Sequence, residues 1–334
     1  MTKKAIENFY FLKNSPQKIQ AKLVSIFKNK KISIKEIKLL KDKLIIDDQY
    51  KITALVTLGK NLPSKIILEI HDNGDYFARN LFALKEFKKI RQLKTAKLYG
   101  FLPELKIIIR EYIEGDFLIG PFLKEGVNLN QIKKMIRKFA ERLADIHNLK
   151  IKRSDKFLFK KLNQKVEKKI LNRTIEFIKP NIKSLQSLIK KNLRALNKKT
   201  DSVEKGNKNC LIHGDYQLAN FIQKNNSLYL TDFDTIEIGN PFRDLGRFLF
   251  QLTYFLKISK KSPPKKIKEL ENLFLESYLN YRPHFQISNF QVNLNLYKAQ
   301  MIQYLILGKI WGERTPNHKE IKQLLNEQSK LLKI

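Results

Sequence analysis

The first third of the chain alternates short apolar segments with polar turns. Four segments are rich in Ile, Val and Leu and are separated by polar residues or by Gly and Pro: residues 32–40, 51–58, 64–70 and 104–113. Segments of this length and composition predict strands, and we expect four or five of them in an antiparallel arrangement. Between them, the run that carries Glu86, Phe87, Ile90 and Leu93 predicts a helix.

Helical spacing dominates the chain after Gly115. Apolar residues recur every three or four positions over residues 129–149 and again over 158–178, where the pattern stops at Pro180. A further helix is predicted to run to about Lys198, followed by a polar loop up to residue 209. Trp311 also lies at helical spacing, which favours packing in a core over stacking on a substrate.

These two patterns predict an α+β protein with two lobes. We expect an N-terminal lobe over residues 1–110, in which residues 1–30 are a helical lead-in, and a larger helical lobe over residues 111–334. The joint is predicted near residues 111–115. A chain of 334 residues with 43% hydrophobic residues is large enough for a buried core in each lobe.

The charge balance suggests a polyanion partner at first sight. The chain has 66 Lys and Arg against 32 Asp and Glu, a formal net charge of +34. However, 54 of these basic residues are Lys and only 12 are Arg, whereas Arg is the preferred reader of bases and phosphates. A charge excess of this kind is most often a solvated surface, so we do not expect nucleic acid as a partner.

Compartment signals are few. The single cysteine, Cys210, excludes an internal disulfide and a Cys-based zinc site. The N-terminal residues lack the apolar core of a signal peptide, and no apolar run approaches the ~18 residues of a membrane span. We therefore expect a cytoplasmic protein without membrane attachment.

Residues 209–234 contain the candidate catalytic and metal-binding side chains. Apolar positions around Asn225 and Asn226 predict a hairpin, in which paired residue numbers sum to about 451. This register places Asn220 opposite Thr231 and next to Asp232, at the open end of the hairpin. Gly214 permits a tight loop that brings Asp215 towards the same end.

The oxygen donors of this stretch are those that Mg²⁺ prefers, namely carboxylates and an amide with no thiolate partner. Residues 211–247 contain five acids and three bases, a local balance of −2 in a strongly basic chain. The pattern therefore favours a positioned cation, although caps and turns are an alternative role for Asp and Asn. Asp234 is either an outer acid of this site or a turn residue.

The spacing of these residues resembles that of a known family. His213-Gly214-Asp215, Asn220 five positions later and Asp232-Phe233-Asp234 after a short hairpin are similar to the aminoglycoside phosphotransferase and choline kinase family, whose fold is protein-kinase-like. Residues 239–245 also resemble the stretch that precedes the family's next helix. The element order agrees over roughly residues 30–310.

The resemblance implies roles for individual residues. Asp215 would orient a substrate hydroxyl and accept its proton, while Asn220 and Asp232 would hold Mg²⁺ against the nucleotide phosphates. The Glu111 carbonyl and the Ile113 amide would face the nucleotide base. Two further residues would be structural: Asp244 would brace the catalytic loop and His213 would be a loop residue. Independently of the resemblance, the position of His147 on the apolar face of a predicted helix favours a satisfied core residue over a ligand.

One position departs from the family pattern. The family has a lysine on the third strand that grips the phosphates and pairs with a helical glutamate, but Glu69 aligns with that lysine and Glu86 with the glutamate. A swapped pair of Glu69 with Lys85 would preserve the structural link. The segment between the first two strands contains no glycine, so no backbone nest for phosphates is evident.

The favoured function is that of a small-molecule kinase, with Mg²⁺ as cofactor and ATP or GTP as co-substrate. The acceptor would be a hydroxyl of a sugar, an amino alcohol or an amino-sugar. Because of Glu69, the alternative is a degenerate relative that binds nucleotide or a partner without transferring phosphate. Charge alone motivates a third hypothesis, nucleic-acid binding.

Overall fold

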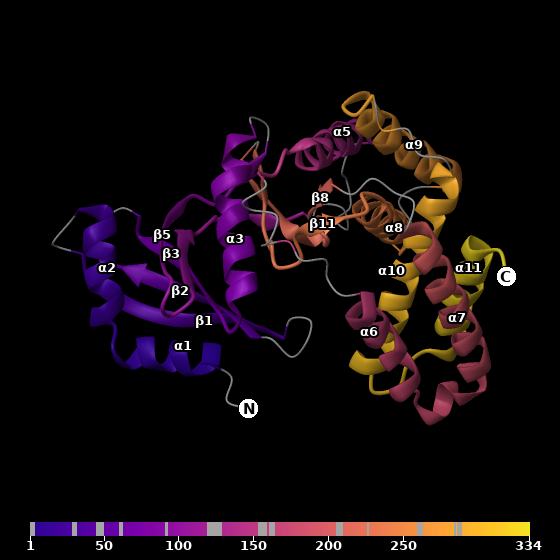
Figure 1. The fold of residues 1–334 in the computed structure, drawn as a ribbon, viewed down its shortest axis with the longest axis horizontal. Helices are drawn as coiled ribbons and strands as arrows, with labels where there is room; N and C mark the ends of the chain where they lie inside the picture. The colour runs from indigo at the N-terminus through magenta and orange to yellow at the C-terminus, as the bar shows by residue number, and fades with distance from the viewer. Residues whose placement is uncertain are drawn as a thin grey trace. The chain divides into compact units, whose positions relative to one another are not determined.

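A computed structural model gives the structure of the protein over most of the chain. The described residues are 4–28, 32–44, 50–59, 63–90, 93–118, 129–152, 159, 164–204, 210–225, 227–258, 263–283, 285 and 289–334. They form two compact units. The first comprises residues 1–117 and 220–236, and the second comprises residues 118–219 and 237–334. The predicted α+β class is confirmed (Figure 1).

The first unit is built on a five-stranded antiparallel sheet in the order β1-β2-β3-β6-β5. The predicted strands are confirmed, and one further strand, β5, lies at the edge opposite β1. The strands are β1 (Ile34–Leu44), β2 (Tyr50–Leu58), β3 (Lys65–His71), β5 (Leu98–Leu102) and β6 (Ile107–Glu111). Residues 45–49, part of the segment that lacks glycine, lie outside the described residues.

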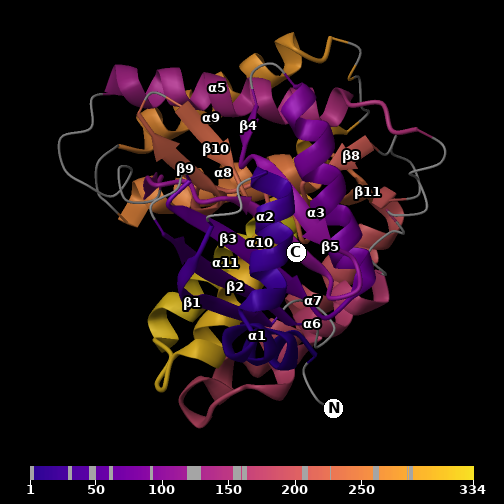
Figure 2. The same ribbon diagram turned by 90° about the vertical axis from the view of Figure 1, so that its left-hand side faces the viewer.

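One face of this sheet packs on the two N-terminal helices, α1 (Lys4–Asn14) and α2 (Gln17–Phe27). Alternate strand residues such as Ile52 and Leu68 join Phe9 and Leu23 in this core, because successive side chains of a strand point to opposite faces. Figure 2 shows α1 and α2 in front of the strands.

Helix α3 (Gly74–Glu86) lies on the other side of the sheet, where the rings of His71 and Phe77 are in edge contact at 6.3 Å. Asn73 caps the helix, since its side chain accepts a hydrogen bond from Asp75 N. The helix that the sequence predicts around residues 86–93 is therefore misplaced. It ends at Glu86 and is followed only by the 3₁₀ turn η2 (Phe87–Lys89).

A second, four-stranded sheet completes the first unit in the order β4-β10-β9-β7. Its strands are β4 (Lys94–Thr95), β7 (Asp116–Phe117), β9 (Phe221–Lys224) and β10 (Ser227–Leu230). The β9–β10 hairpin is thus part of the first unit, although it follows the helical region in sequence. The first unit also extends to Phe117 rather than to the predicted joint at residues 111–115.

The second unit is helical. Its longest helix, α10, packs against α6, α7, α8 and α11, while α5 packs on α9. Its helices are α5 (Leu129–Asn148), α6 (Gln164–Glu176), α7 (Gln186–Glu204), α8 (Phe242–Ile258), α9 (Pro264–Asn280), α10 (Phe290–Gly312) and α11 (His318–Leu332), with the 3₁₀ segment η4 (Pro180–Leu185). The short strands β8 (Cys210–Ile212) and β11 (Glu237–Gly239) pair in antiparallel fashion.

Two helix predictions need correction. The helix predicted to stop at about Lys198 continues to Glu204, and within this extension Thr200 is buried and its hydroxyl donates to Leu196 O at 2.8 Å. Trp311 does not lie in the core. It is 64% exposed in the last turn of α10 and stacks on Phe177 at 6.4 Å. Residues 158, 160–163 and 205–209 of the predicted elements lie outside the described residues.

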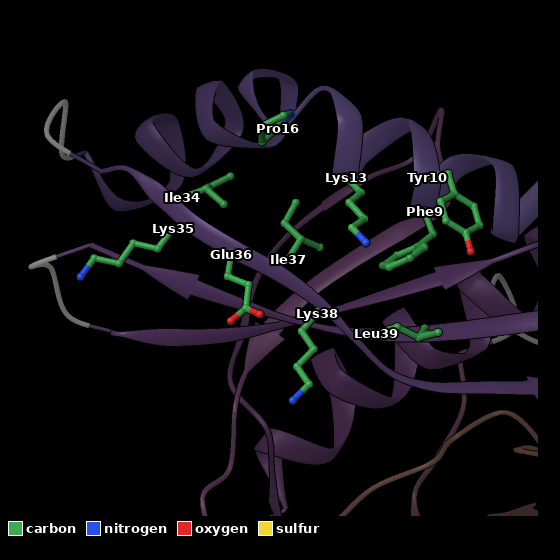
Figure 3. A pocket seen from close by; sticks show the side chains of 10 residues that line it. All are labelled: Phe9, Tyr10, Lys13, Pro16, Ile34, Lys35, Glu36, Ile37, Lys38 and Leu39. Carbon is green, nitrogen blue, oxygen red and sulfur yellow. The ribbon is translucent and has the colours of Figure 1, made fainter.

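A groove separates α1 from the edge strand β1 in the first unit (Figure 3). Phe9, Tyr10 and Lys13 line it from the helix, and residues 34–39 line it from the strand. None of the residues that the sequence places in an active site lines this groove.

Candidate active site

The loop that carries Asp215 follows β8 in the second unit and is held by Asp244. The Asp244 carboxylate accepts hydrogen bonds from His213 N at 2.7 Å and from Gly214 N at 2.8 Å. Gly214 has a φ of 76°, a conformation that favours glycine and turns the chain sharply before Asp215. The predicted bracing role of Asp244 is confirmed.

His147 completes this brace from α5. Its Nε2 lies 3.1 Å from Asp244 Oδ2 and its Nδ1 lies 2.8 Å from the Tyr278 hydroxyl. Because an ionised carboxylate only accepts, Nε2 carries the proton and Nδ1 accepts from Tyr278. Burial would raise the pKa of Asp244, but the hydrogen bonds from His147 and the backbone hold the pKa below its ordinary value. His147 is thus the satisfied core histidine that the sequence predicts.

Asp215 has two partners within the second unit. Its Oδ1 pairs with the Arg247 guanidinium of α8, and its Oδ2 accepts a hydrogen bond from Gln217 Nε2 at 2.8 Å. Arg247 in turn lies over the Tyr304 ring at 5.5 Å. One guanidinium donor and one amide donor therefore hold the two oxygens of this carboxylate in one orientation.

The hairpin of the first unit has the predicted register. Phe221 pairs with Leu230 and Lys224 pairs with Ser227, so the paired numbers sum to 451. Beyond the last pair, the Asn220 carbonyl accepts hydrogen bonds from Thr231 N at 2.9 Å and from Thr231 Oγ1 at 3.0 Å. The structure therefore brings Asn220 next to Thr231 and Asp232, while Asp215 belongs to the second unit. Asn226 of the turn lies outside the described residues.

Asp232 follows this open end in a left-handed conformation, with a φ of 64°. This backbone is uncommon for residues other than Gly, but Asp and Asn tolerate it. Its side chain remains 16% exposed, whereas that of Asp234 is 1% exposed. The two carboxylates therefore differ in access although they are only two residues apart.

A lysine that the sequence does not reveal joins these two carboxylates. Lys51 Nζ of β2 lies 2.9 Å from Asp232 Oδ1 and 2.7 Å from Asp234 Oδ2. Burial would lower the pKa of Lys51, but Asp232, Asp234 and Glu69 together raise this pKa above its ordinary value. A lysine near the start of a strand usually lies on the protein surface, so nothing in the sequence predicts that Lys51 is buried against two carboxylates.

Asp234 also accepts a hydrogen bond from Asn80 Nδ2 of α3 at 2.9 Å. Asn80 itself is buried and donates a second bond to the Tyr76 carbonyl at 3.0 Å. Asp234 thus links α3, β2 and the segment after β10, which favours its role as an outer acid of the site over that of a turn residue.

Glu69 pairs with Arg110 of β6 rather than with Lys85. Arg110 Nη2 lies 2.8 Å from Glu69 Oε1, and Arg110 Nε donates to the same oxygen at 2.9 Å. Burial would raise the pKa of Glu69, but Arg110 and Lys51 lower it to about 2. Lys85 lies instead over the Phe101 ring at 4.9 Å, so the swapped pair predicted from the sequence is wrong.

Glu86, which aligns with the family's helical glutamate, has a local partner. Its Oε1 lies 2.5 Å from Lys89 Nζ, on the exposed side of the helix end. Glu69 and Glu86 therefore each pair with another residue in the described part of the chain, and they do not form the lysine–glutamate pair that the family resemblance implies.

Glu111 and Ile113, the residues expected to face the nucleotide base, lie at the end of β6 and just beyond it. The Glu111 amide donates to Lys97 O at 2.8 Å, and its carbonyl accepts from Arg110 Nη1 at 3.2 Å. Ile113 is buried. Their contact with a nucleotide remains a prediction.

The residues at the hairpin end fit a hard divalent cation. They offer the carboxylate of Asp232 and the amide of Asn220, while Asp234 is buried behind them and bonded to Lys51 and Asn80. Among the described residues, no three His, Cys, Asp or Glu side chains could hold a metal by themselves. An ion here would thus take further ligands from phosphate oxygens and water, which is the coordination that Mg²⁺ favours.

A small pocket lies beside this end of the hairpin, within the first unit. Its polar lining consists of Glu69, Arg110, Thr231 and Asp232, and its apolar lining includes Leu84 and Phe233. In the part of the chain that the structure describes, no helix is long and apolar enough to cross a membrane.

Known proteins share this architecture. The chain resembles the ADP-bound aminoglycoside phosphotransferase APH(2'')-Ib, with 18% identity, a TM-score of 0.56, and coverage of 92% of this chain and 98% of that one. It resembles the choline kinase LicA from Streptococcus pneumoniae with 18% identity, a TM-score of 0.57, and coverage of 96% and 99%. The amicoumacin kinase hAmiN, in complex with AMP-PNP and Ca²⁺, matches with 12% identity, a TM-score of 0.59, and coverage of 87% and 88%.

At this identity, the solved structures establish the fold alone. No curated protein sequence matches the chain. The family model for choline/ethanolamine kinase, however, matches residues 50–331, which include β2, the Asp215 loop, the hairpin and Asp232. The chain therefore belongs to the choline/ethanolamine kinase family and is a small-molecule kinase.

Proposed function

We propose that this protein transfers the γ-phosphate of ATP or GTP to a hydroxyl group of a small molecule, with Mg²⁺ as the metal. The acceptor classes that we favour are a sugar, an amino alcohol and an amino-sugar. The observation that carries the proposal is the register of the β9–β10 hairpin, which sets Asn220 against Thr231 and beside Asp232.

Three residues have separate roles in the proposed phosphoryl transfer. Asn220 and Asp232 would hold the metal, which when bound neutralises charge on the phosphates. Asp215 would orient the acceptor hydroxyl. The hydroxyl oxygen bonds to the γ-phosphorus, the bond from that phosphorus to the β–γ bridging oxygen breaks, and the nucleoside diphosphate leaves while the hydroxyl proton passes to the Asp215 carboxylate.

The environment of Asp215 supports this role. Its two oxygens are directed by Arg247 and Gln217, and the loop beneath it is fixed by Asp244. Phosphoryl transfer depends mainly on positioning and on electrostatic stabilisation, which a carboxylate held in one orientation supplies without reorganisation. Glu111 and Ile113 would contact the nucleotide base from the end of β6.

The test is a direct assay of phosphate transfer. The full chain is incubated with Mg²⁺, ATP or GTP and a panel of hydroxylated acceptors, and phosphorylated products are detected by ³¹P NMR. We expect a phosphate monoester with at least one acceptor, and its loss by about 10³-fold in Asp215→Asn. Full activity in that variant would refute the role of Asp215.

The alternative is a protein that binds nucleotide without transferring phosphate. Its motivation, the acidic residue at the third-strand position, is weakened by the finding that Glu69 is neutralised by Arg110. Nucleotide-dependent thermal stabilisation without product from any acceptor would favour this alternative, since ligand binding to the native state raises stability.

A further inference from the structure

The family pattern leaves a charge problem in the first unit. Metal-bound phosphates call for a basic side chain beside the metal, yet the strand position where the resemblance leads us to expect it holds Glu69. Arg110 carries a positive charge nearby, but its guanidinium already bonds Glu69 and the Glu111 carbonyl. The structure therefore has to meet this need from another element.

Lys51 comes from the neighbouring strand and lies on the appropriate face. In β2, Ile52 and Ala54 point into the core beneath α1 and α2, so Lys51 and Thr53 point to the opposite face. Lys51 pairs across the strands with His71, and Thr53 pairs with Glu69. Lys51 is thus the diagonal neighbour of Glu69, within reach of a long side chain.

The contacts of Lys51 connect the sheet to the metal ligands. Lys51 is 5% exposed, and its Nζ lies within 3 Å of both Asp232 and Asp234. Mg²⁺ binds carboxylate and phosphate oxygens at about 2.1 Å, so an ammonium group bonded to the Asp232 oxygen that holds the ion lies within about 7 Å of phosphate oxygens on the same ion. Its four-carbon stem allows the remaining distance to be closed by rotation.

We propose that Lys51 of β2 is the side chain that binds the nucleotide phosphates in this protein, in place of a lysine on β3. The inference rests on the proposed function, because it takes Asp232 as a metal ligand. Asp234, itself bonded to Asn80, holds the ammonium in position, and Arg110 neutralises the acidic side chain of β3, Glu69.

The first experiment separates phosphate contact from a structural role. The affinities of the full chain for the nucleoside triphosphate, diphosphate and monophosphate and for the nucleoside are measured by titration calorimetry with Mg²⁺, for the base that the wild type prefers. A charged hydrogen bond supports a change of about 10- to 100-fold, so we expect Lys51→Met to lose that much affinity for the triphosphate and diphosphate. Binding of the nucleoside should change less than about twofold.

Lys65→Met is the matched control. Lys65 lies on the neighbouring strand, faces the Tyr112 ring at 5.5 Å and pairs with Thr57, at the opposite end of β3 from His71, which pairs with Lys51. We expect the affinities of this variant to equal those of the wild type. Equal triphosphate affinities in Lys51→Met and Lys65→Met would overturn the proposal, as would an equal loss for nucleoside and triphosphate in Lys51→Met.

Two measurements cover the case in which Lys51→Met does not fold. The double variant Lys51→Met with Asp234→Asn removes the buried charge on both sides and is compared with Asp234→Asn alone.

In the wild type, a nucleotide acyl phosphate transfers its acyl group to a lysine beside the phosphates, where the amine forms an amide and the nucleotide leaves. Acylation at Lys51 is expected by mass spectrometry, and acylation at another lysine instead would contradict the inference.

The outcomes also distinguish the inference from the proposed function. A wild-type protein that transfers phosphate while Lys51→Met retains triphosphate affinity leaves the proposed function intact and refutes only the role of Lys51. A wild-type protein that binds no nucleotide refutes both.

Discussion

Two carboxylates of this chain's candidate active site, the buried Asp244 and the partly exposed Asp232, are held in opposite ways. Asp244 of the second unit receives two backbone N–H groups and a histidine, and it is fully buried. Asp232 of the first unit receives the ammonium of Lys51 and keeps part of its surface accessible. The oxygens of Asp244 are fully occupied by hydrogen bonds that fix a loop. The charge of Asp232 is instead balanced by Lys51, a partner that a metal ion can replace.

The largest effect is expected from Asp232. Asp232→Asn removes a proposed metal ligand, so we predict a loss of kcat of about 10³-fold, equivalent to about 4 kcal/mol of transition-state stabilisation. Stability should change little, because Lys51 retains its contact with Asp234. Steady-state kinetics and thermal unfolding of the same preparation test this. Wild-type kcat in the variant would contradict the assignment.

Asp244→Asn should show the reverse pattern in stability. The amide cannot accept all of the hydrogen bonds from His213 N, Gly214 N and His147, and its own N–H₂ faces donors. We predict a decrease of about 2–4 kcal/mol in the free energy of unfolding, measured by urea denaturation. Activity should fall as well, since the Asp215 loop loses its anchor. Stability equal to that of Asp232→Asn would remove the contrast between the two carboxylates.

The hairpin shows how far the sequence alone can reach. Its register follows from a turn and an alternation contained within about ten residues, so the position of Asn220 beside Asp232 could be predicted. The Asp244 brace was expected from the family resemblance. The hairpin and the two backbone bonds to Asp244 lie within residues 213–244, whereas the bond from His147 to Asp244 spans 97 residues.

Lys51, by contrast, is 181 residues away from its partner Asp232 in the sequence. Asn80 and Asp234 are likewise distant, with a separation of 154 residues. Such contacts depend on how a strand, a helix and a hairpin pack, which periodicity does not encode. The error at Trp311 has a related cause. Helical spacing identifies the side of α10 on which the residue lies, but not whether a neighbouring element covers that last turn.

His71 adds a pH dependence to the first unit. Neither of its ring nitrogens has a hydrogen-bond partner among the described residues, and burial lowers its pKa to about 3. The unfolded chain binds this proton at a pKa near 6.5. Stability therefore falls as the pH drops from about 6.5 towards 3, because over this interval only the unfolded state takes up the proton.

His71→Leu should remove this dependence. We predict that the wild type loses about 1–3 kcal/mol of unfolding free energy between pH 6.5 and 4.5, and that the variant loses less. Glu69 does not contribute over this interval in the same way. Its pKa of about 2 lies below the ordinary value, so its stabilisation is complete above about pH 4.5 and is lost only as the pH falls towards 2. Identical pH profiles of the two proteins would exclude His71 as the source.

Arg247 is expected to have the smallest effect of the four. It acts through Asp215 as a positioning residue, so Arg247→Met should lower kcat by about tenfold with little change in KM. Arg247→Lys should restore part of the activity. Lys257→Met is the control, since its pair with Glu327 is exposed and worth no more than about 0.5 kcal/mol. A change in KM alone would assign Arg247 to acceptor binding instead.

The most direct test of the account is whether the open end of the hairpin holds the metal. Mn²⁺ is titrated into the wild type with and without nucleotide and followed by electron paramagnetic resonance, alongside Asp232→Asn and Asn220→Ala. We predict one tightly bound ion in the presence of nucleotide, with affinity reduced at least about tenfold in both variants. Equal Mn²⁺ affinity in all three proteins would contradict the assignment of Asn220 and Asp232 as metal ligands.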